Sequence, residues 1–363
     1  MKPIRLLIHW PHFPGYVAAC VAELRRRHPV DTLVLYNRVE TNAPYARQQY
    51  QGVGEVCDIT GSSQAGLDEL IREFHPSAAI VGGWMPQAQR LARSAKALEI
   101  PVVACSDNLF RGKLRQRLFP LYRRLFLRRL HDYYWVPGQK AKEYLVWAGV
   151  KPSSIWPGLY APDIFRFQTV ASLRGTAPKS TRPAFLFLGQ YISRKGLPEL
   201  LTAFEAASVG DWRLILCGSG PLKGLVARHA ARLGRIEDRG FLQPPELPQV
   251  MAEATVFVLP SRHDAWPLVI GEAAAAGLPV VCSDACGCAV ELVREGDNGF
   301  TCPPNSVPAL KSALERMASL ADAQLEAMGQ KSRELVAPYS PSNWAAFLFG
   351  KLCRVVQNKN RAR

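Results

Sequence analysis

The sequence lacks any apolar run long enough to cross a lipid bilayer. A transmembrane helix needs roughly 18–20 consecutive apolar residues, and no stretch of the 363 residues reaches that length. The start also lacks the apolar core of a signal peptide, because only Leu6–Ile8 are consecutive apolar residues there. We therefore expect a cytoplasmic protein that is at most peripheral at the inner face of a membrane.

Two other signatures are missing. The nine cysteines are an odd number, and Cys286 and Cys288 have no second Cys/His pair at the spacing of a zinc site. We expect reduced structural thiols and no bound metal. The first apolar segment is followed by His-Phe-Pro-Gly, without a Gly-x-Gly-x-x-Gly motif, which argues against a nicotinamide-dependent oxidoreductase.

Acidic residues are scarce. Lys and Arg number 45 against 30 Asp and Glu, a net charge of +15. The excess is concentrated in residues 111–129, which hold eight basic residues and no acid, interleaved with leucine and aromatic residues. Two interpretations stay open: contact with an anionic membrane surface or lipid-phosphate acceptor, or a solvated helix face that covers part of the N-terminal core. Nucleic acid is not expected as a partner, because no nucleic-acid motif accompanies the charge.

Apolar strands alternate with helical segments in both halves of the chain, which predicts an α/β protein with parallel, doubly wound sheets. Expected strands are 4–8, 32–36, 78–81, 102–105, 133–136, 184–188, 212–217, 238–242, 256–259 and 280–282. Expected helices are 17–27, 67–74, 87–98, 197–207, 222–233, 247–254, the segment around Glu272, 307–317 and the tail from 342.

A polar segment rich in proline, glycine and serine separates the two halves. It predicts an N-terminal domain over 1–165, a linker over 166–183 and a C-terminal domain over 184–341. The tail 342–363 carries an apolar stripe at helical spacing.

Residues 260–300 are the most informative stretch. An apolar strand ends at Leu259, a turn carries Asp264, and Glu272 follows eight positions later in a small-residue helix. A ligand above the turn would meet one carboxylate from the loop and one from the helix. Carboxylates with backbone donors between them suit the hydroxyls of a sugar and a ribose. The helix dipole is expected to favour ionised Glu272.

Two glycine-containing turns precede that stretch. In the first, Gly189 and Gln190 end a strand, and Arg194 and Lys195 come before the next helix, a pattern that suits a diphosphate. In the second, Gly218 and Gly220 lie between a strand and a helix, which is also typical of an ordinary tight turn.

The order Pro-Ser, acid, seven residues, Glu-Ala and Gly-x-Pro-Val resembles the donor-binding signature of family 4 glycosyltransferases. The resemblance implies two facing Rossmann-like domains with a cleft between them (the GT-B fold), retention of anomeric configuration, and no cofactor. It also implies that the C-terminal helix 342–363 packs back on the N-terminal domain. Asp264 stands where many members have Glu, and Gln190 where Arg is common.

The resemblance also implies roles for individual residues. The predicted catalytic group is Lys195, Arg194, Asp264 and Glu272, with the cations on the diphosphate, Asp264 on a sugar hydroxyl and Glu272 on the ribose. Donor-binding positions are Gly189, Gln190, Gly218, Gly220, Phe241, Leu242, Leu247, Trp266, Pro267 and Leu268.

The acceptor side is expected in the N-terminal half. Gly15 follows the first strand, where the family has a glycine-rich loop. The family's catalytic His has no counterpart, since Ser106-Asp107-Asn108 follows the matching strand. Asp107 and Asn108 are acceptor-side candidates, and a simple Asp-Asn turn is the alternative. His9 and His12 have no third ligand nearby, which favours structural or acceptor-side roles over metal binding.

These patterns predict a hexosyltransferase that moves a sugar from a nucleotide-diphosphate donor to a carbohydrate or lipid-linked acceptor of bacterial surface polysaccharide synthesis. Two alternatives stay open. A nucleotide-sugar epimerase of the same fold would need no second substrate. A non-catalytic protein that binds a sugar nucleotide or a membrane would transfer nothing.

Overall fold

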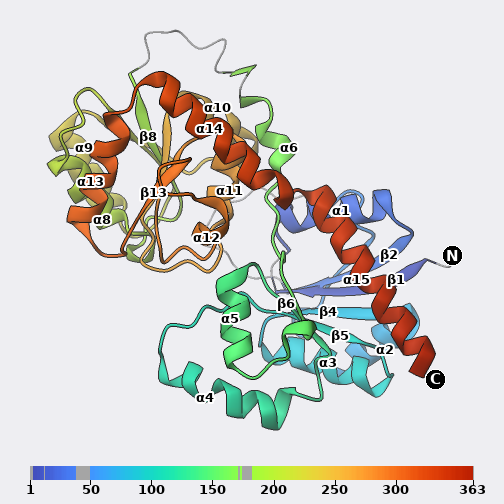
Figure 1. Ribbon diagram of the computed structural model, residues 1–363. Coiled ribbons are helices and arrows are strands. Elements are labelled where there is room, and N and C mark those ends of the chain that lie inside the picture. Colours follow the sequence, from blue (N-terminus) through green and yellow to red (C-terminus); the bar gives the residue numbers. More distant parts are fainter. Residues whose placement is uncertain (1–2, 12, 38–49, 171, 174–181, 363) are drawn as a thin grey trace. The chain divides into compact units, whose positions relative to one another are not determined.

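The computed structural model describes residues 3–11, 13–37, 50–170, 172–173 and 182–362 (Figure 1). Its contacts divide the chain into two compact units. Unit 1 comprises described residues up to 161 together with the tail from 341, and unit 2 comprises those between 162 and 340.

Unit 1 holds a seven-stranded, fully parallel sheet in the order β3-β2-β1-β4-β5-β6-β7. Its elements are β1 (Ile4–Trp10), α1 (Gly15–Arg27), β2 (Val30–Tyr36), β3 (Glu55–Asp58), α2 (Gln64–Phe74), β4 (Ala78–Gly82), α3 (Pro86–Ala97), β5 (Val102–Cys105), α4 (Leu114–Tyr122), the π-helix η1 (Arg123–Leu127), β6 (Tyr133–Trp135), α5 (Gln139–Trp147), η2 (Pro152–Ser154), β7 (Ile155–Trp156) and α15 (Pro341–Ala362).

The central strands of unit 1 are buried on both faces, as parallel strands between helices must be. β4 is buried along its whole length, and β1 from Leu6 onward. Figure 1 shows α1 and α15 together on one side of the sheet and α2 with α3 on the other. Alternate residues of β1 and β4, including Leu6, Ile8 and Ile80, pack in the core that α1 and α15 cover.

The C-terminal helix α15 completes the core of unit 1. The Trp344 ring stacks on the Trp135 ring with centroids 5.0 Å apart, and its Nε1 donates to the Leu159 carbonyl at 2.9 Å. The apolar stripe continues through buried Leu348 and Leu352. A segment far away in sequence thus supplies one side of the first unit's core.

Unit 2 holds a six-stranded parallel sheet in the order β10-β9-β8-β11-β12-β13. Its elements are α6 (Ile164–Phe167), β8 (Ala184–Leu188), η3 (Ser193–Lys195), α8 (Leu197–Ala206), β9 (Arg213–Cys217), α9 (Lys223–Leu233), β10 (Ile236–Gly240), η4 (Pro244–Glu246), α10 (Leu247–Glu253), β11 (Val256–Leu259), α11 (Leu268–Ala275), β12 (Val280–Ser283), α12 (Ala289–Leu292), β13 (Gly299–Cys302), α13 (Val307–Ala318), α14 (Asp322–Val336) and η5 (Ala337–Tyr339).

Helices cover both faces of this second sheet. In Figure 1, α8, α9 and α13 lie on one face, and α11 and α14 on the other. Every residue of β8, β11 and β12 is buried. The predicted fold class of two parallel, doubly wound α/β sheets is therefore confirmed.

Some elements differ from expectation. The strands β3, β7 and β13 were not predicted, because they have only two to four residues and no extended apolar run. The units divide at Ala161/Pro162, four residues before the expected boundary, since α6 packs against α11 and belongs to unit 2. Of the expected linker, residues 171 and 174–181 lie outside the described part.

All nine cysteines are free, and seven of them are buried. Across the described residues, no helix combines the length and the apolar character needed to span a bilayer.

Replacing Trp344 by alanine should lower the free energy of unfolding by roughly 3–5 kcal/mol, because it removes a buried ring, its stacking partner and a hydrogen bond. Chemical unfolding monitored by circular dichroism measures the change. The matched control is Gln357→Ala on the exposed side of the same helix, which should change stability by less than about 0.5 kcal/mol. Equal effects of the two substitutions would contradict the packing of α15 onto unit 1.

Candidate functional site

The candidate donor residues of unit 2 lie at one edge of its sheet. Because all six strands are parallel, the loops after β8, β9, β10, β11 and β12 leave at the same edge, which is where ligands bind in open α/β sheets. The structure brings to this edge Gly189, Gln190, Arg194, Lys195, Gly218, Gly220, Phe241, Leu242, Leu247, Asp264, Trp266, Pro267, Leu268 and Glu272.

The loops after β8 and β9 touch backbone to backbone. A Cβ at Gly218 would lie 1.9 Å from the Gly189 carbonyl oxygen, so no larger residue fits there. The Gly218 N–H donates to the Gly240 carbonyl at 2.7 Å, which joins the third loop. Gly220 has φ of +148° and a Cβ there would lie 2.7 Å from the Tyr191 oxygen. The glycines expected to approach a ligand thus also close the loops on one another.

Tyr191, which sequence reasoning missed, anchors these loops from beneath. Its side chain is fully buried and its hydroxyl donates to Asp238 Oδ1 at 2.7 Å. The same oxygen accepts from the Gly240 N–H at 3.0 Å. Burial, reinforced by the Asp238 carboxylate, raises the pKa of Tyr191 far above its ordinary value. The sequence does contain a signal for this role. Tyr191 is an aromatic residue directly after Gly189-Gln190, and the rest of that loop is polar enough to be exposed to solvent.

The three charged residues of the turn motifs meet. Lys195 Nζ forms an ion pair with Asp264 Oδ2, and Arg194 Nη1 lies 3.6 Å from the same oxygen. The Lys195 and Asp264 side chains are only 13% and 12% exposed, whereas Arg194 is 46% exposed. Arg194 Nη1 also donates to the His263 carbonyl at 3.3 Å. One carboxylate therefore faces both cations that we expected on a diphosphate.

Backbone contacts hold this charged group in place. Gly196, which follows Lys195, has φ of +71°, and a Cβ there would lie 1.9 Å from the Pro260 oxygen. The Asp264 N–H donates to the Ala285 carbonyl at 3.2 Å, and the Asp264 carbonyl accepts from the Gly287 N–H at 2.8 Å. The loops after β8, β11 and β12 therefore fix both ends of the ion pair.

Glu272 lies in the second turn of α11 and is partly buried. Within the described part of the chain, its carboxylate has no hydrogen-bond or ion-pair partner. Burial raises its pKa to about 7; Arg166 opposes the shift and Asp163 adds to it. The expectation that the helix dipole would favour the ionised form is wrong here, because the dipole effect fades beyond the first turn and desolvation dominates.

The remaining donor-side candidates differ in what they offer. Gln190 is exposed. Trp266 is buried, with its ring 5.8 Å from that of Tyr339, so only its backbone faces the loop edge. Phe241, Leu242 and Leu247 are half-buried beside the first residues of α10.

The acceptor-side candidates lie in unit 1. Gly15 is the first residue of α1. Asp107 follows β5 and its Oδ2 accepts from the Tyr160 hydroxyl at 3.2 Å, while Asn108 is half-buried next to it. Tyr160 is a further polar group at this position that sequence reasoning missed.

Of the two N-terminal histidines expected to be structural or acceptor-side residues, the structure describes one. His9 is fully buried within β1 and its Nε2 lies 3.2 Å from Asn37 Oδ1. Burial lowers the pKa of its ring, which the hydrogen bond to Asn37 partly opposes. His12 lies outside the described residues. Among the residues described, no three His, Cys, Asp or Glu side chains cluster as metal ligands would.

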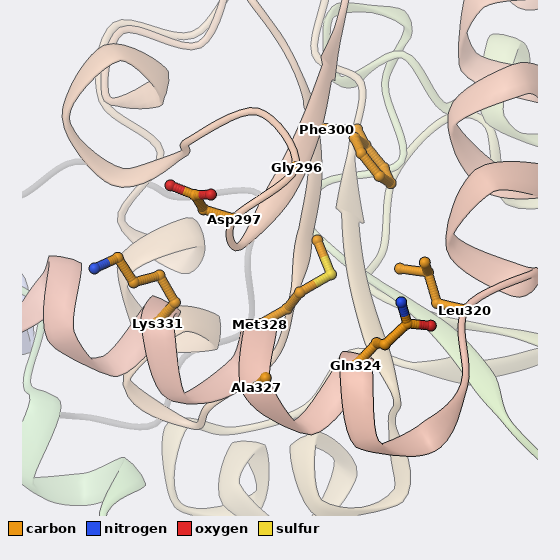
Figure 2. Close-up of a pocket in the computed structure, with 8 residues that line it drawn as sticks. All are labelled: Gly296, Asp297, Phe300, Leu320, Gln324, Ala327, Met328 and Lys331. Carbon is orange, nitrogen blue, oxygen red and sulfur yellow. The ribbon is translucent and has the colours of Figure 1, made fainter.

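A surface hollow of about 530 Å³ lies away from these loops. Figure 2 shows it between the turn before β13 and α14, with Asp297, Met328 and Lys331 among its lining residues. It is therefore at the amino end of β13, the opposite edge of the sheet from Lys195 and Asp264.

Comparisons with known proteins agree with this arrangement. Residues 182–319 match the family model described as "Glycosyl transferases group 1". The chain is 31% identical to an exopolysaccharide phosphotransferase of Streptomyces coelicolor over 46% of this chain and 19% of that protein. It is 34% identical to the O-antigen chain mannosyltransferase B of Escherichia coli over 36% of this chain and 35% of that protein.

A solved structure is similar over nearly the whole chain. Anabaena HepE in complex with UDP and glucose superposes with a TM-score of 0.74 at 17% identity, over 97% of this chain and 100% of that one. This likeness confirms the expected GT-B type of fold. The chain covers less than half the length of the curated relatives that it matches first.

Substituting Gly218 by alanine should destabilise unit 2 by roughly 3 kcal/mol or more, because the new methyl group collides with a carbonyl oxygen that three loops hold in place. Thermal unfolding measures the loss. Gly224→Ala is the matched control: it lies in the same segment, meets no atom closer than 3.9 Å, and should raise helix stability by up to about 1 kcal/mol. A Gly218→Ala protein as stable as the control would refute the close approach of the loops.

Glu272→Gln should stabilise the protein at pH 8 but not at pH 5. The carboxyl has a pKa of about 7 in the folded protein against an ordinary 4.5. Its contribution to stability is therefore full below pH 4.5 and is lost as pH rises to 7. At about 1.4 kcal/mol per pKa unit the gain is at most roughly 3 kcal/mol. Urea unfolding at both pH values measures it, with exposed Glu326→Gln as control. A difference independent of pH would show that Glu272 ionises normally.

Proposed function

We propose that this chain, whose residues 182–319 match the family model of the group 1 glycosyl transferases, is a retaining glycosyltransferase that moves a hexose from a nucleoside-diphosphate donor to a saccharide acceptor. One observation carries the proposal. The Lys195–Asp264–Arg194 group and Glu272, which has no partner among the described residues, lie at the carboxyl edge of the unit 2 sheet, within the matched segment.

The diphosphate would bind against Lys195 and Arg194. Gly189 has no side chain that would keep a phosphate from its backbone. Gly218 has none either, so the loop after β9 can lie directly against the loop after β8. In the free protein, Asp264 neutralises part of the cationic charge. A bound diphosphate must therefore either share Lys195 with Asp264 or displace Asp264 from Lys195. Displacement would turn the Asp264 carboxylate toward the hydroxyls of the donor sugar.

Glu272 would accept hydrogen bonds from the two ribose hydroxyls. Two features support this assignment: the carboxylate has no partner within the described chain, and burial holds its pKa near 7. A pair of hydroxyl donors would favour the ionised form and lower that pKa. The donor would thus supply hydrogen bonds that the described part of the chain does not give to Glu272. Backbone at Phe241 and Leu242, with Leu247, would contact the base.

The chemical step would depend on electrostatic stabilisation. Negative charge grows on the leaving diphosphate as its bond to the sugar breaks, and Lys195 and Arg194 are positioned to stabilise it. We propose that no metal ion and no cofactor takes part. A front-side attack assisted by the leaving phosphate would retain the anomeric configuration without a protein nucleophile.

On the acceptor side we propose Gly15, Asp107 and Asn108. Asp107 already accepts a hydrogen bond from Tyr160, and its second oxygen could accept from an acceptor hydroxyl. The names of the relatives that act on exopolysaccharide and O-antigen chains support an acceptor in bacterial surface polysaccharide synthesis, and we propose a lipid-linked saccharide. Such an acceptor would place the protein in the cytoplasm, at the inner face of the membrane.

The donor should stabilise the protein against heat. At about 100 times its dissociation constant a ligand adds roughly 2.7 kcal/mol, or a rise in Tm of about 5–10 °C. We expect one of UDP, GDP or ADP, with its common sugars, to give this shift. Lys195→Ala and Glu272→Ala should abolish it, and Lys331→Ala, in the hollow of Figure 2, should keep it.

Transfer assays with the donor so identified separate the alternatives. Sugar transfer to a lipid-linked saccharide, with the anomeric configuration retained, supports the proposal. Conversion of the sugar nucleotide without an acceptor would identify an epimerase. A thermal shift without conversion or transfer would identify a binding protein, and no shift with any nucleotide would overturn the proposed donor site.

A further inference from the structure

The segment 114–127 forms one bent helix on the outside of unit 1 (Figure 1). One of its faces is firmly anchored. Gln116 is buried and its Nε2 donates to the Leu109 carbonyl at 2.6 Å. Phe119 packs on Trp84 with ring centroids 5.1 Å apart. Arg123 Nη2 donates to the Gly149 carbonyl at 2.7 Å, and Leu127 is fully buried.

The opposite face carries an apolar stripe that no described residue of unit 1 covers. Leu114, Leu118, Leu121 and Leu125 are spaced four, three and four residues apart, so they share one side of a helix. Leu114 is 73% and Leu125 64% exposed, and Phe126 beside them is 62% exposed. The anchored residues lie about half a turn away at 3.6 residues per turn. These leucines therefore do not cover the N-terminal core.

Exposed arginines border this stripe. Arg115, Arg117 and Arg124 lie within the helix, and Arg128 and Arg129 follow directly after its end. None of the five forms a salt bridge among the described residues, and 111–129 contains no acidic residue. We call this surface, the four leucines with Phe126 and the five arginines, the leucine–arginine face.

We propose that the leucine–arginine face binds the surface of a bilayer containing anionic phospholipid, with the helix lying in the plane of the interface. Apolar side chains flanked by arginines match the boundary between acyl chains and anionic headgroups. A helix of this length, about 20 Å, could not span the roughly 30 Å hydrocarbon core.

The charge pattern also selects between occupants. A second copy of the chain on this face would bring ten arginines together without an acid in 111–129 to pair them, which is unfavourable. A nucleic acid would match the arginines but leave the leucine stripe in water. An anionic lipid surface, unlike these two, matches both the charge and the apolar stripe.

This inference deepens the proposed acceptor class but does not depend on the donor site. A bilayer bound at this face would hold unit 1 where a lipid-linked saccharide presents its sugar. Membrane binding should therefore persist in Glu272→Ala, which removes the proposed ribose contact. Failure of the glycosyltransferase proposal and failure of the membrane proposal can thus be told apart.

Co-sedimentation of the full chain with vesicles tests the proposal. We expect binding to phosphatidylglycerol–phosphatidylcholine vesicles and little binding to phosphatidylcholine alone. Binding should weaken when salt rises from about 0.1 M to about 1 M, as the Debye length falls from about 10 Å to about 3 Å. The pair Arg117→Gln and Arg124→Gln should weaken partitioning roughly 30-fold, at about fivefold per arginine.

The pair Leu118→Ser and Leu125→Ser should weaken partitioning at least about tenfold, with an unchanged Tm because both side chains are exposed. Matched controls are Arg72→Gln with Arg228→Gln, and Leu98→Ser with Val290→Ser, exposed residues on other elements; these should bind as the parent does.

Three outcomes would overturn the proposal: no binding to anionic vesicles, binding that the leucine pair leaves unchanged, or a dimer in solution that the leucine pair dissociates. The last would assign the face to a second copy of the chain.

Discussion

The candidate site depends on the direct backbone contact between the loops that follow β8 and β9. The Gly189 carbonyl occupies the place where any side chain at Gly218 would lie. Because Gly218 also donates to Gly240, three consecutive strands end in one joined layer of backbone, with Tyr191 buried under it. The proposed binding of a nucleotide diphosphate at this edge requires the low, fixed loops that these contacts produce.

Above that layer the charges are arranged in two different ways. Lys195, Arg194 and Asp264 compensate one another across two loops, so the ligand-free site does not hold an isolated buried cation. Glu272 has no such partner among the described residues, and burial is the main cause of its raised pKa. In the proposed complex, the anionic diphosphate of the donor would replace Asp264 as the partner of the two cations. The ribose diol of the same donor would give Glu272 hydrogen-bond partners. The two acids would therefore interact with a ligand differently: Asp264 would have to leave its cations, whereas Glu272 would only gain hydrogen bonds.

The helix over 114–127 has two different sides. Gln116, Phe119 and Leu127 hold the helix to the unit through hydrogen bonds and packing. The leucines of the other side contribute nothing to the core, and they raise the free energy of the protein in water by exposing apolar surface. This cost in free energy is offset if the stripe is buried in an apolar environment, as the proposed binding to a bilayer surface would do.

The sequence by itself determined the strand–helix alternation, the fold class and the order of the turn motifs, because each is encoded within a few residues: apolar runs such as Ala184–Leu188, glycines at strand ends, and cations before a helix. Only the tertiary structure decided the pairing of Lys195 with Asp264, 69 positions apart, the anchoring of Tyr191 by Asp238, and the pKa of Glu272. It also decided which face of 114–127 is exposed. The spacing of the leucines is the same whether their side of the helix packs on a core or faces solvent. Each of these depends on which distant segments come together, and local spacing carries no information about that.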